Sequence, residues 1–201
     1  VNILSTTATG NAIRGNLIGT NAAGTLALAN TAAGINVNGP SNVIGGTTAA
    51  DRNVISGNTG NGINILSSAT GTTVLGNFIG TNSAGSAAVP NTGGGVNLGT
   101  SNNVVGGLTA SARNVISGNG VPGSGIYAHG VGVFGTITGN QIQGNFIGLN
   151  TSGTAAIANT GIGVQIGTAA SGTLVGGTAA GAGNVISGNG FGNPVTGNDT
   201  G

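Results

Sequence analysis

The chain has 201 residues, of which 45 are Gly, and its formal net charge is only +1. Its hydrophobic content of 37% with so little charge excludes a disordered polyelectrolyte, and three Arg with no Lys leave no cationic track for nucleic-acid phosphates. Irregular Gly spacing excludes collagen, the absence of Cys excludes disulfides and thiolate metal sites, and no apolar run reaches the roughly 20 residues of a membrane-spanning helix.

Short apolar segments begin at the first residue and continue along the whole chain. Those of one kind read Gly-apolar-x-apolar and cover 1–3, 35–37, 63–65, 96–98 and 164–166. Those of a second kind end in Gly and cover 13–15, 43–45, 74–76, 104–106, 142–144 and 174–176. They are rich in β-branched residues and bounded by Gly, Asn, Ser or Thr, which predicts short strands separated by turns. The density of Gly excludes helices.

A third element, Asn-apolar-Ile-small-x-Asn, occurs six times, as in NVISGN at 53–58 and GNFIGTN at 76–82. Three of its columns are invariant within the chain. The leading Asn is at Asn16, Asn53, Asn77, Asn114, Asn145 and Asn184. The Ile is at Ile18, Ile55, Ile79, Ile116, Ile147 and Ile186. The closing Asn is at Asn21, Asn58, Asn82, Asn119, Asn150 and Asn189.

Three short strands per unit of about 24 residues, as between Asn53 and Asn77, predict one coil of a parallel β-helix. Successive coils stack about 4.8 Å apart, so identical residues form columns along the axis. We expect the Ile column to face a dry core and both Asn columns to form hydrogen-bonded ladders. Gly is expected at corners, where the backbone needs a positive φ. The prediction is an all-β solenoid of about six to seven coils.

Two kinds of insert interrupt this pattern and define a longer repeat. The first, third and fifth copies precede TNAAGTLALANTAAG, TNSAGSAAVPNTGGG and LNTSGTAAIANTGIG, whereas TTAADR, LTASAR and TAAGAG precede the other three. The repeat is therefore a pair of coils. A single domain is predicted over 1–201, with repeats at approximately 1–58, 59–119 and 120–189 and a lead-in at 190–201.

The residue before the repeated Ile is larger where the long insert follows. Leu17, Phe78 and Phe146 stand there, against Val in the other three copies. We expect these larger side chains to pack beneath apolar residues of the inserts, namely Leu26, Leu28, Val89 and Ile157.

The NVISGN and GNFIGTN strings resemble the parallel β-helix repeats of bacterial secreted and cell-surface proteins, within the wider pectin-lyase-like family of solenoids. The resemblance covers essentially the whole chain. It implies a right-handed coil and an extracellular setting, or the surface of a bacterial or archaeal cell. It implies no particular reaction, because that family includes lyases, hydrolases, tailspikes and adhesins.

Few residues are candidates for chemistry. Hydrolysis of a glycosidic bond needs paired carboxylates, and the chain has only Asp51 and Asp199, so no catalytic, cofactor-binding or metal-binding residues and no cofactor are predicted. Tyr127 and His129 lie in the coil with atypical spacing and are either a contact patch for a glycan or other surface ligand or an ordinary surface segment. Asp51 and Arg52 are expected to be solvated or to form a weak local ion pair.

The two ends of the sequence continue one another in phase, because VNILSTTATG at the start mirrors INILSSATG within the chain. The sequence therefore predicts a non-enzymatic extracellular structural protein, a fibre subunit that stacks head to tail with itself and also associates laterally. Nucleic-acid binding and a membrane span are not expected. The alternative is a stalk or repeat segment of a surface adhesin. An ice-binding protein is disfavoured, because Thr-x-Thr does not recur at coil spacing.

Overall fold

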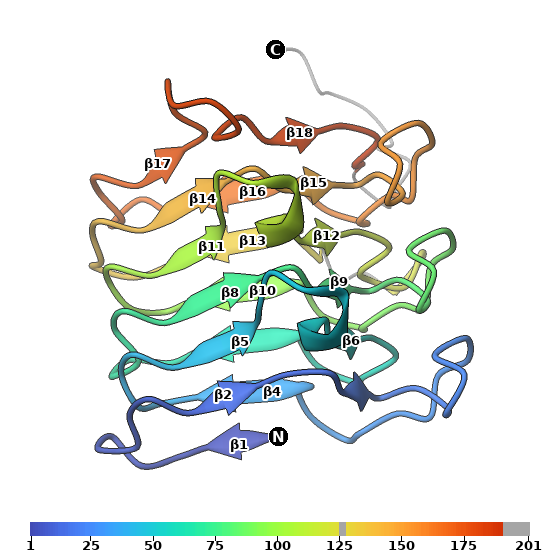
Figure 1. Ribbon diagram of the computed structural model, residues 1–201, viewed down its shortest axis with the longest axis horizontal. Coiled ribbons are helices and arrows are strands. Elements are labelled where there is room, and N and C mark those ends of the chain that lie inside the picture. Colours follow the sequence, from blue (N-terminus) through green and yellow to red (C-terminus); the bar gives the residue numbers. More distant parts are fainter. Residues whose placement is uncertain (125–127, 191–201) are drawn as a thin grey trace.

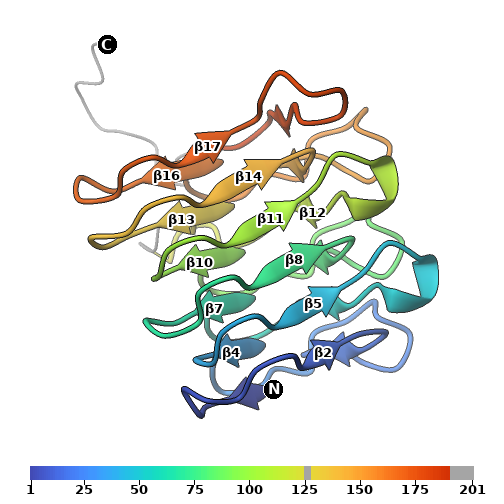
Figure 2. The same ribbon diagram turned by 60° about the vertical axis from the view of Figure 1, so that its left-hand side comes forward.

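The computed structural model describes residues 1–124 and 128–190, which form a right-handed parallel β-solenoid with three faces (Figures 1 and 2). Each face is a six-stranded parallel sheet in which every coil contributes one strand. We number the strand triplets coils 1 to 6, beginning with β1–β3 and ending with β16–β18. Between β1 and β16 the chain makes about five turns, slightly fewer than the six to seven coils predicted.

The strands occur where the repeats predict them, except for β13 (Val131–Val133), which was not predicted. The first sheet contains β1 (Asn2–Ile3), β4 (Ile35–Val37), β7 (Ile63–Ile65), β10 (Val96–Leu98), β13 (Val131–Val133) and β16 (Val164–Ile166). The second contains β2 (Ala12–Ile13), β5 (Val43–Gly45), β8 (Thr73–Leu75), β11 (Val104–Gly106), β14 (Gln141–Gln143) and β17 (Leu174–Val175). The third contains β3 (Leu17–Ile18), β6 (Val54–Ile55), β9 (Phe78–Ile79), β12 (Val115–Ile116), β15 (Phe146–Ile147) and β18 (Val185–Ile186).

The repeated Ile residues form a column inside the solenoid, as predicted. Strand pairing places each Ile of the third sheet directly on the next, for example Ile55 on Ile79. Ile55, Ile79, Ile116 and Ile147 are completely buried. Alternate residues of the other two sheets point into the same core, so the interior is filled by Ile, Val and Leu.

Gly at the corners has the expected left-handed backbone, and Gly106 shows why. Its φ is +88°, and a Cβ built there would collide with the carbonyl oxygen of Gln143 and the side-chain amide of Asn145 in the next coil. The close vertical approach of two coils therefore requires the absence of a side chain at this corner.

The long inserts form loops that lie above one another at the right edge of Figure 1. Each is closed by an isolated antiparallel bridge, at Thr20–Ala27, Thr81–Ala88 and Leu149–Ala156. They also contact one another directly, since the Ser83 amide donates to Gly24 O at 2.9 Å and the Thr151 amide donates to Gly85 O at 2.9 Å. The shorter inserts contain the 3-10 helices η1 (Ala49–Asp51) and η2 (Ala110–Ala112).

The packing predicted beneath the long inserts is only partly correct. Val89 and Ile157 are buried, but Leu26 and Leu28 are 67% and 66% exposed. The Phe78 ring lies against the turn of the insert at Gly85, where a Cβ would come within 3.0 Å of it. The large side chain therefore packs against the glycine turn of the insert.

Candidate functional site

The surfaces at which one coil meets the next are the dominant chemical feature of the structure. The leading Asn residues form a continuous ladder in which each Nδ2 donates to Oδ1 of the Asn in the next coil, as Asn53 does to Asn77 at 2.9 Å and Asn77 to Asn114 at 3.1 Å. Each interior amide also donates to a backbone carbonyl, such as Ile44 O from Asn77. The four interior members are fully buried, so the ladder satisfies polar groups that would otherwise destabilise the core.

The predicted closing-Asn column divides into two groups. Asn58, Asn119 and Asn189 do form a ladder, which is buried except at its ends, but its alternate members come from the inserts, so that Asn58 donates to Asn91 at 2.8 Å and Asn91 donates to Asn119 at 2.9 Å. The full order is Asn30, Asn58, Asn91, Asn119, Asn159, Asn189.

The other predicted members of that column, Asn21, Asn82 and Asn150, instead hold the turns of the inserts. The Oδ1 of Asn82 accepts from the backbone amides of Ser86 and Ala87. The long insert carries the chain away from the column after the closing Asn and returns it at the Asn of its Asn-Thr pair. That pair recurs in all three inserts and is the signal that the prediction overlooked.

A third amide column, also unpredicted, lies at the corner before the second sheet. Asn11 donates to Asn42 at 2.9 Å, and Asn103 donates to Asn140 at 3.2 Å. Thr72 occupies the intervening position, so this column is interrupted, and the buried Nδ2 of Asn140 has no hydrogen-bond partner.

The junction between two-coil repeats has its own set of contacts. The Arg52 guanidinium lies 4.2 Å from the centre of the Phe78 ring, and its Nε donates to Gly76 O at 3.2 Å. Arg113 repeats this arrangement over Phe146, at 4.0 Å. We call each such pair an Arg–Phe clasp. The two clasps join coil 2 to coil 3 and coil 4 to coil 5. Each gives the Phe that precedes the repeated Ile a second contact, in addition to the glycine turn of the insert.

Hydrogen bonds from Ser and Gly complete the same junction. Ser56 Oγ donates to Thr81 O at 2.7 Å, and the Gly57 amide donates to Val89 O at 3.0 Å. Ser117 and Gly118 make the equivalent bonds one repeat later, to Leu149 O and Ile157 O.

The faces of coil 1 and coil 6 expose residues that are buried in interior coils. Leu28 is 66% exposed, whereas Val89 at the equivalent position is 5% exposed. Leu17 is 42% exposed against 4% for Phe78, and on coil 6 Ile186 is 43% exposed although it belongs to the buried Ile column. These faces present the inward and interlayer surfaces of a coil to solvent.

Hydrogen-bonding groups on the two faces are also unsatisfied, in a complementary way. Within the described residues, Oδ1 of Asn16 and of Asn30 accepts no hydrogen bond, although the equivalent atoms in every later coil do. The backbone amides of Asn184 and Gly188 have no acceptor there, whereas those of Asn53 and Gly57 do. In these two buried columns, and within residues 1–124 and 128–190, coil 1 thus presents free acceptors and coil 6 presents free donors.

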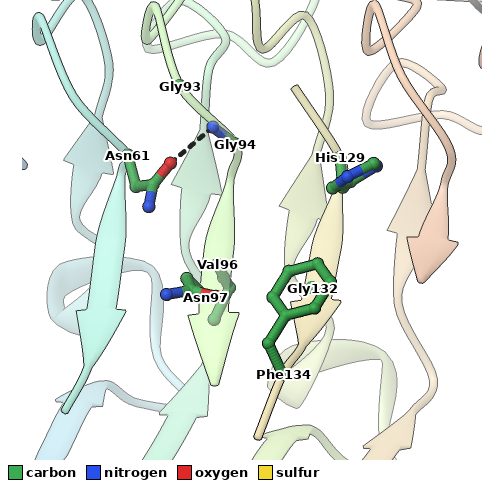
Figure 3. Close-up of a pocket in the computed structure, with 8 residues that line it drawn as sticks. All are labelled: Asn61, Gly93, Gly94, Val96, Asn97, His129, Gly132 and Phe134. Carbon is green, nitrogen blue, oxygen red and sulfur yellow. Dashed lines mark hydrogen bonds between the residues drawn. The ribbon is translucent and has the colours of Figure 1, made fainter. Parts of the chain in front are cut away.

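A cavity of about 300 Å³ opens on the outer face of the first sheet, where His129 is placed (Figure 3). The outward residues of β4, β7 and β10 are Asn, but Gly132 occupies that position in β13, and the Phe134 ring bends back over the gap. The cavity is lined by Asn61, Gly93, Gly94, Val96, Asn97, His129, Gly132 and Phe134. Tyr127, the other residue predicted for a surface contact, lies outside the described residues.

The electrostatics of this cavity are those of an uncharged site. His129 is half-buried, its ring centroid is 5.9 Å from that of Phe134, and its buried Nδ1 has no hydrogen-bond partner among the residues that the structure describes. Desolvation by burial lowers the pKa of His129 below 6.5, so the imidazole is neutral at pH 7.

The few charges have structural contacts. Asp51 accepts from Thr48 Oγ1 at 2.8 Å beside a capping box, and its ion pair is with Arg14 at 3.6 Å, not with Arg52, which was one of the two alternatives expected from the sequence. Asp199 lies outside the described residues. Across residues 1–124 and 128–190, no three His, Cys, Asp or Glu side chains gather into a potential metal site. The same ranges contain no helix long and apolar enough to cross a membrane.

The comparisons with known proteins add no relative. No protein-family model, curated protein or solved structure matches this chain.

Proposed function

We propose that this chain is a non-enzymatic structural solenoid of the extracellular or cell-surface kind, whose end faces pair with further coils of the same repeat to build a fibre. One observation carries the proposal. The junction between repeats occurs twice inside the chain, and among the described residues the faces of coil 1 and coil 6 carry the equivalents of its two halves, apart from the Arg–Phe clasp, without a partner. The extracellular setting rests on the resemblance of the repeat strings.

The exposed apolar surface on these faces provides a driving force for association. Leu17, Leu28, Val185 and Ile186 are each more than two-fifths exposed, while their interior equivalents are buried, apart from the half-buried Phe146. Full burial of one such side chain contributes about 1.5 to 3 kcal/mol. Open sheet edges add backbone donors and acceptors that a further coil would pair. Several such groups acting together offset the entropy lost when two molecules associate.

The distribution of charges favours a structural protein over an enzyme. A catalytic pair of carboxylates would need two acidic groups in one cavity, and Asp51 is held by Thr48 and Arg14 at an insert instead. With a net charge of +1 there is little electrostatic repulsion to keep molecules apart, which also favours lateral association of fibres.

A stalk segment of a surface adhesin is the second candidate, because the same end faces would then be covered by neighbouring coils of a longer chain. Analytical ultracentrifugation and negative-stain electron microscopy of the 201-residue chain over a concentration series separate the two. A fibre subunit forms assemblies that lengthen with concentration. A chain that stays monomeric throughout contradicts the fibre and leaves the stalk.

A further inference from the structure

Both buried Asn ladders have a direction. In the leading ladder every Nδ2 donates toward the next coil in chain order, from Asn16 to Asn53 and on to Asn184. The ladder from Asn30 to Asn189 runs the same way. Because the two ladders are parallel, the coil 1 face carries their free acceptors and the coil 6 face carries their free donors, at the bottom and top of Figure 1.

This polarity decides which pairs of faces match. Two coil 1 faces brought together would oppose the Oδ1 atoms of Asn16 and Asn30 to one another, and two coil 6 faces would oppose donors to donors. Each buried group left without a partner is destabilising, because it loses its hydrogen bonds to water and gains none in return. A coil 6 face on a coil 1 face instead joins donors to acceptors in both ladders.

The repeat of two coils leads to the same pairing. Coil 6 is of the same kind as coils 2 and 4, and coil 1 is of the same kind as coils 3 and 5, so coil 6 on coil 1 would reproduce an existing junction. Ser187 and Gly188 would then stand below Thr20 and Leu28, as Ser56 and Gly57 do below Thr81 and Val89.

The Arg–Phe clasp provides a further sign of this match. Where interior junctions carry Arg52 or Arg113, coil 6 has Gly183, and where they carry Phe78 or Phe146, coil 1 has Leu17. Both halves of the clasp are replaced together. A junction of coil 6 with coil 1 therefore leaves neither an Arg without its ring nor a Phe without its cation.

We propose that the partner of each end face is the opposite end face of a second copy of this chain, joined head to tail with Asn184 donating to Asn16 and Asn189 to Asn30. This inference rests on the proposed fibre function and specifies its geometry. Such a heterologous contact does not close on itself by two-fold symmetry, and its repetition extends a polar filament.

Variants that block one face test the proposal. Leu28→Arg obstructs the coil 1 face, and Ser187→Arg obstructs the coil 6 face, where the equivalent Ser56 and Ser117 are fully buried. Leu108→Arg places the same charge on an exposed lateral position and is the matched control. Circular dichroism and thermal unfolding establish that each variant is folded before assembly is measured by ultracentrifugation.

Head-to-tail joining predicts that each blocked variant self-associates at least about a hundredfold more weakly than the unmodified chain, while Leu108→Arg assembles normally. An equimolar mixture of the two blocked variants forms one-to-one dimers and nothing longer. Dimers of Ser187→Arg alone would show joining through two coil 1 faces, and dimers of Leu28→Arg alone would show joining through two coil 6 faces. Either result overturns the polarity but keeps self-association.

Two other outcomes separate this inference from the proposed function. Normal assembly of both blocked variants would show that chains associate through their sides, which overturns the end-to-end junction. An unmodified chain that remains monomeric at every concentration overturns the fibre function together with the polarity.

Discussion

Two Asn columns of the solenoid have nearly the same amide-to-amide distances but span different numbers of coils. The buried leading ladder continues through all six coils, whereas the half-exposed column on the first sheet runs from Asn2 through Asn36 to Asn64. It stops there, because Oδ1 of Asn64 accepts from Asn61 instead of Asn97, and Gly132 follows in the next strand. Amide stacking alone therefore does not maintain a column. The interior amides of the leading ladder are fully buried and also donate to backbone carbonyls, which distinguishes them from the half-exposed column.

The largest expected effect comes from removing the space in which a buried amide sits. We expect Gly106→Ala to destabilise the fold by about 3 to 5 kcal/mol, because the new methyl group meets Gln143 O and the Asn145 amide at a positive φ. Gly10→Ala is the control, since Gly10 has a φ of +71° but no atom within 4 Å of the added Cβ. It should cost only about 1 kcal/mol. Urea unfolding measures both, and equal losses would contradict the argument.

Removing the amides compares the two columns directly. Asn114→Ala should cost about 3 kcal/mol, because Asn114 exchanges hydrogen bonds with Asn77, Asn145 and Val74 O in the dry interior. Asn64→Ala removes similar amide contacts at the surface, where water replaces them, and should cost no more than about 0.5 kcal/mol. The comparison fails if thermal unfolding shows the two variants to be equally stable.

The Arg–Phe clasp should contribute less than a buried Asn. We expect Arg113→Ala and Phe146→Leu to show a coupling of about 0.5 to 1 kcal/mol in a double-mutant cycle, the usual strength of a cation over an aromatic ring. Arg14→Ala is the control, because its ion pair with Asp51 is solvent-exposed. Additive effects of the Arg113 and Phe146 substitutions would show that the ring and the guanidinium act independently.

The smallest effect on stability is expected from His129, which lies beside the break in the exposed Asn column. Burial lowers the pKa of His129 in the folded state, so the unfolded chain binds the proton more readily. Stability is therefore complete above the unfolded pKa of about 6.5 and declines slightly as the pH falls from there through the lower folded pKa. His129→Gln should flatten this dependence. An unchanged pH profile of the melting temperature in that variant would assign the dependence to another group.

The sequence predicts the parts of this architecture that depend on strict periodicity. The leading Asn and Ile columns could be read directly, because every coil repeats them without an insertion between Asn and Ile. The ladder containing Asn91 could not be predicted in the same way. Its alternate members lie near the ends of the long inserts, and local sequence does not show that the chain comes back to the column at that point. The strand around Gly132 was also missed, although residues 130–133 fit the Gly-apolar-x-apolar pattern, because the atypical spacing of that coil set it apart from the other copies. The ion pair of Asp51 depends on which coil lies below it, which local sequence does not specify.

The contacts between inserts define the unit in which this chain can change its length. Ser83 on Gly24 and Thr151 on Gly85 form a second line of hydrogen bonds beside the main body, and this line advances by two coils at each step. Loss or gain of a single coil would set the inserts on either side at the wrong heights and break this outer line, while the inner ladders would still join. Duplication or deletion of a coil pair preserves both. The inserts therefore restrict variants of different length to whole pairs of coils.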